Sequence, residues 1–149
     1  MKSFKLFFHS CMSLFFSKKL FMIGFILFIY PALILGYLWV ECFKSDFTDG
    51  KNGQLDAYRH TLASAMVAYT LSPKAVVVVT KIMERKGNIA NLMDQHNNAL
   101  GAIIGVDAKS INELNSQVIN HVQHGAINTN IRTQTTWLPQ NFWGNSFFW

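Results

Sequence analysis

The chain has 149 residues and a mass of 17.0 kDa, enough for one domain but not for a second sizeable core. Half of its residues are hydrophobic and 14% are charged, against about 25% charged in an ordinary soluble domain. This composition excludes intrinsic disorder, and two cysteines are too few for a disulfide scaffold. Four lysines in residues 1–40 account for most of the +5 net charge. The basic pI therefore reflects the N-terminal arm and is no argument for nucleic-acid binding, so we expect no nucleic-acid partner.

Residues 1–19 are a basic, aromatic leader. Its apolar side chains share one helical face, which favours a helix lying in the cytoplasmic headgroup region of a membrane. The members of that face are Phe4, Phe7, Phe8, Cys11 and Phe15. A plain hydrophobic leader is the alternative interpretation.

Residues 20–40 predict a transmembrane helix. The segment runs from Leu20 to Val40 without a charged side chain. As a helix it would be about 31 Å long, which matches the hydrocarbon core of a bilayer. Pro31 is tolerated in such a span, and Tyr37 and Trp39 suit the interface at its far end.

The lysines on the N-terminal side of this span predict its orientation. Lys18 and Lys19 directly precede it, so the positive-inside rule keeps the N-terminus in the cytoplasm. We therefore expect a single-pass protein of the inner membrane with residues 41–149 in the periplasm. A cleaved signal peptide is the competing interpretation, but no clear small-x-small cleavage site precedes Glu41.

The exported part is predicted to be a small all-α bundle. A polar tether, residues 41–53, leads into a helical domain at residues 54–125. Four helices are expected there, at about 54–71, from Pro73 to near Gly87, at 89–104, and from a capping box at Ser110 and Glu113 to Gly125. No strand or hairpin signal is present. The fold class is thus mainly α, with a signal-anchor helix in front.

Residues 126–149 form an aromatic-rich tail. Six of the 21 aromatic residues lie between Trp137 and Trp149. Such a tail either packs over the bundle or offers a surface to the membrane or a protein partner, because exposed aromatic clusters are costly. Both interpretations stay open.

The first cluster that could carry chemistry is Asp56-Ala-Tyr-Arg59-His60. Spacings of i, i+3 and i+4 place its three polar side chains on one helical face. A carboxylate beside an imidazole can orient it as a general base. This predicts His60 as the base, Asp56 as its orienter, and Arg59 as the group that holds an anionic part of the substrate.

The second cluster lies on the third helix of the domain, where Asp94, Asn97, Asn98 and Gly101 share one face. Polar side chains on an apolar helix are costly to bury unless they are paired. We expect Asp94 to act in catalysis and the two asparagines to bind substrate, with Glu84 as a further candidate. Gly101 would allow a close approach of backbone or ligand.

A purely structural network is the alternative for both clusters, with Asp94 paired to Arg59. His121 and His124 are spaced as a metal pair would be, but a solvated pair is more common. Neither H-E-x-x-H nor a cysteine-rich zinc pattern is present, and no nucleotide fingerprint occurs. The sequence therefore predicts no metal and no cofactor.

The two clusters together resemble a bacterial family of exported and toxin-associated α-helical domains of unknown function, with D-A-x-R-H and M-D-x-x-N-N-x-x-G motifs. The matching segments are DAYRH at 56–60 and MDQHNNALGAIIG at 93–105. The acid between the motifs often follows a histidine in that family, but Glu84 follows Met83 here, which weakens its assignment. The resemblance implies an enzyme of the cell envelope.

Three functions fit these features. The leading hypothesis is a membrane-anchored hydrolase acting on peptidoglycan, lipid or peptide bonds near the bilayer. The second is a non-enzymatic interaction protein, such as an assembly, immunity or exclusion factor, that binds a partner through the tail. The third is a phage lysis or lysis-control protein.

Overall fold

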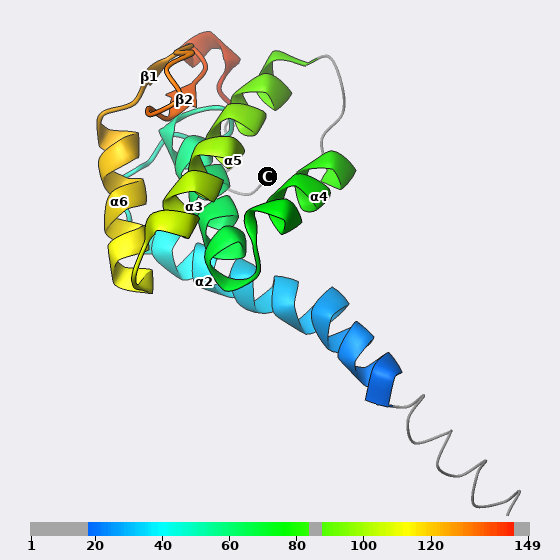
Figure 1. Ribbon diagram of the computed structural model, residues 1–149. Coiled ribbons are helices and arrows are strands. Elements are labelled where there is room, and N and C mark those ends of the chain that lie inside the picture. Colours follow the sequence, from blue (N-terminus) through cyan, green and yellow to red (C-terminus); the bar gives the residue numbers. More distant parts are fainter. Residues whose placement is uncertain (1–17, 84–87, 145–149) are drawn as a thin grey trace, which may run out of the picture. The chain divides into compact units, whose positions relative to one another are not determined.

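The computed structural model describes residues 18–83 and 88–144 of the chain. The chain divides into two compact units, Met1–Gly36 and Tyr37–Trp149 (Figure 1). Most of the predicted leader, residues 1–17, lies outside the described residues, as does Glu84.

The described part of the first unit is helical and contains a π-helical segment. The helix begins at Lys18 and ends at Lys44, with η1 at Phe25–Ile29 followed by α2 at Tyr30–Lys44. The Tyr30 backbone N–H donates to the Phe25 carbonyl, five residues back. Pro31, which has no N–H to donate and whose ring crowds the preceding turn, follows directly. A π turn beside a proline is a common way to accommodate this defect.

This helix is long and apolar enough to cross a membrane. Many of the apolar side chains along it are exposed. In its first-unit part, up to Gly36, the most exposed of the large ones are Leu20, Phe21, Leu27, Phe28 and Leu33. The helix extends four residues beyond the predicted span.

The last turns of α2 belong to the second unit and pack within it. Leu38 and Cys42 are buried there. Asn115 donates from Nδ2 to Glu41 Oε2 at 2.6 Å and accepts from the Tyr58 hydroxyl at 2.8 Å. Burial raises the pKa of Tyr58 far above its usual value, with Cys42 and Glu41 adding to the effect, so the phenol stays a proton donor. Glu41 and Cys42, predicted as part of a tether, are thus helical and packed.

Four helices form the body of the second unit (Figure 1). They are α3 at Gln54–Thr70, α4 at Pro73–Met83, α5 at Ile89–Asp107 and α6 at Ile111–Gln123. Asn88 caps α5, and Ser110 caps α6 by accepting from the Glu113 N–H. The mainly α class is therefore as predicted. Helix α5 continues three residues past the predicted end.

The α3–α5 interface is the most extensive contact between helices in the described chain, and two glycines make it close. A Cβ on Gly101 would lie 2.2 Å from the Thr61 carbonyl oxygen, and one on Gly105 would lie 2.2 Å from that of Ala65. Gly105 follows Gly101 on α5 just as Ala65 follows Thr61 on α3, so the two helices run in the same direction. The approach expected at Gly101 is therefore that of a neighbouring backbone.

The C-terminal segment packs on the helices rather than extending from them. A parallel pair of two-residue strands, β1 at Ala126–Ile127 and β2 at Thr136–Trp137, precedes the short helix η2 at Gln140–Phe142. No strand was expected from the sequence. Trp137 and Leu138 are buried in a cluster with Ala57 and Met93. At these two positions the tail is part of the core.

Asn97 ties this segment to α5. Its Nδ2 donates to the Thr136 carbonyl at 2.7 Å, and its Oδ1 accepts from the Thr136 N–H at 2.9 Å. The side-chain amide thus acts as a strand neighbour for β2. This pairing gives the irregular segment a hydrogen-bond partner that it could not supply for itself.

Candidate functional site

The first turns of α3 carry Asp56, Arg59 and His60, and the loop before the helix fixes the first of them. The Asn52 N–H donates to Asp56 Oδ2 at 2.6 Å. Asn52 adopts a positive φ of 66°, which asparagine tolerates better than most residues. The carboxylate therefore accepts a hydrogen bond from the chain just outside its own helix.

The other oxygen of Asp56 is paired with Arg59. Nη2 of Arg59 donates to Oδ1 at 2.6 Å, and the two residues are 2% and 4% exposed. Charged side chains buried this deeply require such pairing. Arg59 thus lies inside the domain and supports Asp56.

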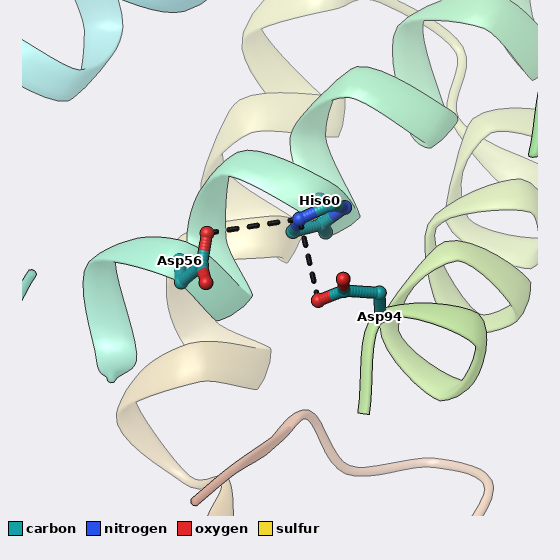
Figure 2. A group of neighbouring side chains, drawn as sticks. All are labelled: Asp56, His60 and Asp94. Carbon is teal, nitrogen blue, oxygen red and sulfur yellow. Dashed lines mark ion pairs between the residues drawn. The ribbon is translucent and has the colours of Figure 1, made fainter. Parts of the chain in front are cut away.

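His60 and Asp94 form the more accessible part of the cluster (Figure 2). The His60 side chain is 22% exposed and that of Asp94 is 18% exposed. His60 Nε2 lies 3.3 Å from Asp94 Oδ1 and 3.6 Å from Asp56 Oδ1. Because Asp94 is on the second turn of α5, the structure brings the two sequence motifs together at one end of the α3–α5 interface.

The remaining predicted site residues have other neighbours. Asn97 is fully buried and holds β2. Asn98 is buried and accepts from the Ser64 hydroxyl at 2.8 Å, across the α3–α5 interface. Asp56 and Asp94, by contrast, both approach the His60 ring. The structure therefore gathers the three predicted catalytic residues and places the two asparagines along the adjoining interface.

His121 on α6 and His124, which directly follows that helix, both have backbone partners. His121 Nδ1 lies 2.9 Å from the Thr133 carbonyl oxygen, and His124 Nδ1 lies 2.9 Å from that of Asn120. Each ring therefore has a local role in the fold.

Asn52 is the supporting residue that the sequence analysis missed. Besides donating to Asp56, it accepts from the Leu138 N–H at 2.9 Å and donates from Nδ2 to the Phe142 carbonyl at 2.7 Å. The only signal in the sequence was the turn-forming pair Asn52-Gly53. That pair predicts a turn but not the three contacts.

Comparison with known proteins gives one match. Residues 20–130 match the family DUF6973, a domain of unknown function. No curated protein and no solved structure matches the chain. The match covers the apolar helix, the two motifs and the four helices of the domain. The chain therefore belongs to the DUF6973 family.

Proposed function

We propose that this protein is a membrane-anchored hydrolase of the cell envelope, with Asp56, His60 and Asp94 as its reactive groups. One observation carries the proposal: carboxylates from two helices lie 3.6 and 3.3 Å from the same nitrogen of a partly exposed imidazole. Groups of this type cluster at sites that move protons. The substrate would be peptidoglycan, a lipid or a peptide within reach of the bilayer.

The proposed reaction is hydrolysis, in which water attacks a carbonyl carbon or a phosphorus atom and displaces the leaving group. The site takes a proton from water as the water oxygen bonds to the electrophilic carbon or phosphorus. The same proton then passes to the leaving group as the old bond breaks. Asp56 suits a fixed orienting role because both its oxygens are held, whereas Asp94 lies on the more open side.

The buried polar neighbours fit positioning roles. Arg59 is 2% exposed and donates to Asp56, so we assign it to holding that carboxylate rather than to binding the substrate. Asn97 and Asn98 hold β2 and Ser64, which keeps the surroundings of the site in place. The substrate-binding surface would then lie on the open side, near His60 and Asp94.

The apolar helix supports the proposed location. Its length and composition suit a membrane span, and the lysines before it favour a cytoplasmic N-terminus. The domain would then lie on the periplasmic side of the inner membrane. A periplasm-specific reporter fused after Trp149 should be active, and activity from a cytoplasmic reporter instead would overturn this topology.

The hydrolase proposal is tested with the full-length chain in detergent or vesicles. Release of soluble fragments from sacculi, fatty acids from phospholipid and amines from peptides would be measured separately. We expect one substrate class to be cleaved by the wild type and by His124→Ala, a control for the loss of an imidazole. His60→Ala should abolish cleavage while its melting temperature stays near that of the wild type. No cleavage of any class, or full activity in His60→Ala, would overturn the proposal.

A second function is favoured by the surface of α4. Val77, Val78 and Val79 are about half exposed, an unusual run of apolar side chains for a solvated helix. Such a surface suits an interaction protein that contacts lipid or a protein partner. The tail beyond the buried Trp137 and Leu138 remains a candidate for the same role. In that case His60→Ala would keep its biological effect.

A further inference from the structure

We propose that Asp56, His60 and Asp94 form a binding site for one divalent transition-metal ion. The three side chains each offer one donor atom, and these atoms all lie within 4.8 Å of one another. Two donors come from α3 and one comes from α5, so the site exists only when the helices are packed (Figure 2). This goes beyond the sequence prediction, which contained no metal site.

The donor separations suit a shared ion better than they suit hydrogen bonds. Zinc binds histidine nitrogen and carboxylate oxygen at about 2.0–2.2 Å, which places two ligands at a tetrahedral angle about 3.4 Å apart. The measured separations from His60 Nε2 are 3.3 and 3.6 Å. Good N–H···O hydrogen bonds are shorter, at about 2.7–3.2 Å.

The approach of both carboxylates to one nitrogen also favours a metal ion over hydrogen bonds. Nε2 carries at most one hydrogen, so it cannot donate a well-aligned bond to two acceptors at once. An imidazole held only for proton transfer needs one carboxylate, placed on the nitrogen that does not react. Two carboxylates converging on the same nitrogen are instead the arrangement of ligands around a central cation.

The surroundings of Asp56 resemble the outer shell of a metal ligand. Asn52 and Arg59 each donate to one of its oxygens at 2.6 Å, which fixes the direction of the carboxylate. Ligating carboxylates are commonly held by such bonds. With a neutral His60, two carboxylates and one guanidinium leave a net charge of −1 among these four groups. A bound divalent ion would reverse that charge to +1.

The donor set selects the type of ion. One imidazole and two carboxylates suit Zn²⁺, Mn²⁺ or Fe²⁺, whereas Mg²⁺ and Ca²⁺ prefer oxygen ligands alone. Three protein ligands would leave a coordination position for water on the side where His60 and Asp94 are exposed. A bound ion such as Zn²⁺ lowers the pKa of such a water from far above neutrality to about 7, which would make hydroxide available for hydrolysis. This catalytic use of the ion rests on the proposed function, and in it His60 is a ligand rather than a base. Binding of the ion does not depend on the proposed function.

The test measures metal binding directly. The full-length protein is purified, stripped with a chelator and titrated with Zn²⁺ and, separately, Mn²⁺ by calorimetry. We expect one ion per chain and a higher melting temperature. His60→Ala and Asp94→Ala should weaken binding by about a hundredfold or more, since even the loss of an outer-shell partner costs about 10–100-fold. Asp107→Ala on the same helix and His124→Ala are the matched controls and should bind like the wild type.

Several results would overturn the metal site. They are an absence of binding in the wild type, unchanged binding in both His60→Ala and Asp94→Ala, or loss of binding in His124→Ala. Since Asp94 is partly exposed, the folding of its variant is checked by helix content, and Asp94→Asn is the milder second variant. The two proposals fail separately. One bound ion without hydrolysis would remove only the hydrolase, and hydrolysis by a protein that binds no ion in the titration would remove only the metal site.

Discussion

At one end of the α3–α5 interface, Gly101 and Gly105 let two backbones touch, whereas at the other end Asp56, His60 and Asp94 face each other as side chains. At the glycine end, neither Gly101 nor Gly105 has a side chain that could separate the two backbones. The polar end consists of groups whose separation must be right to a few tenths of an ångström if they are to share a proton or an ion. Gly105 lies about 16 Å along α5 from Asp94. The close contact therefore sets the register that the polar end depends on.

The largest effect on stability is expected at the buried part of the polar end. Asp56→Ala leaves the Arg59 guanidinium, which is 2% exposed, without its carboxylate. Breaking a buried ion pair by removing one partner costs about 3–5 kcal/mol. The free energy of unfolding should fall by that amount in chemical denaturation, while the exposed control Asp46→Ala should be neutral. A fall below about 1 kcal/mol would mean that the pair does not hold the domain.

A smaller but structurally clearer effect is expected at the glycine end. In Gly105→Ala the new Cβ would meet the Ala65 carbonyl at 2.2 Å, so the helices must separate. Overpacking of this kind costs about 1–3 kcal/mol. Gly36→Ala is the matched control, since nothing lies within 4 Å of its Cβ. The informative measurement is made at the other end: Zn²⁺ affinity should fall in Gly105→Ala but not in Gly36→Ala.

If Gly105→Ala is destabilised but binds Zn²⁺ like the wild type, the two ends of the interface are independent. The contact at Gly105 would then not set the register of the polar end, although the proposed metal site would remain.

The smallest effect on stability is expected at the accessible part of the polar end. Asp94→Ala removes a carboxylate whose side chain is 18% exposed, and water can reach the groups that remain. Partly exposed ion pairs contribute about 0–1 kcal/mol, so the melting temperature should change little. Function should nevertheless be lost. A fall as large as that of Asp56→Ala, measured side by side, would assign Asp94 to the buried network instead.

The helices were largely predictable because their ends carry local signals. Pro73 and the Ser110 cap mark starts that the structure confirms. The end of α5 was placed too early, at residue 104, whereas Gly105 packs against Ala65 inside a helix that continues to Asp107. Tertiary contact thus overrode a local propensity for turns.

The site was predictable only in part. Spacing along one helix correctly placed Asp56 and His60 on the same face, but it could not say how Asp94 would approach from another helix. Nor could it show that Asn97 would bond to Thr136, because that contact spans 39 residues and depends on the path of the tail. The proposed metal site was not anticipated for the same reason: its third donor is distant in sequence.

The bonds of Asn52 have a consequence for the order of assembly. Asn52 holds Asp56 but is itself bonded to Phe142, 90 residues later, so this loop closes only after nearly the whole described chain has emerged. Contacts this distant in sequence form late, because the entropy of loop closure must be overcome first. A nascent chain that has completed α6 already contains Asp56, His60 and Asp94. It still lacks Phe142, whose carbonyl holds the Asn52 loop that fixes Asp56. The candidate site would therefore gain its final geometry only after the four helices of the domain have been made.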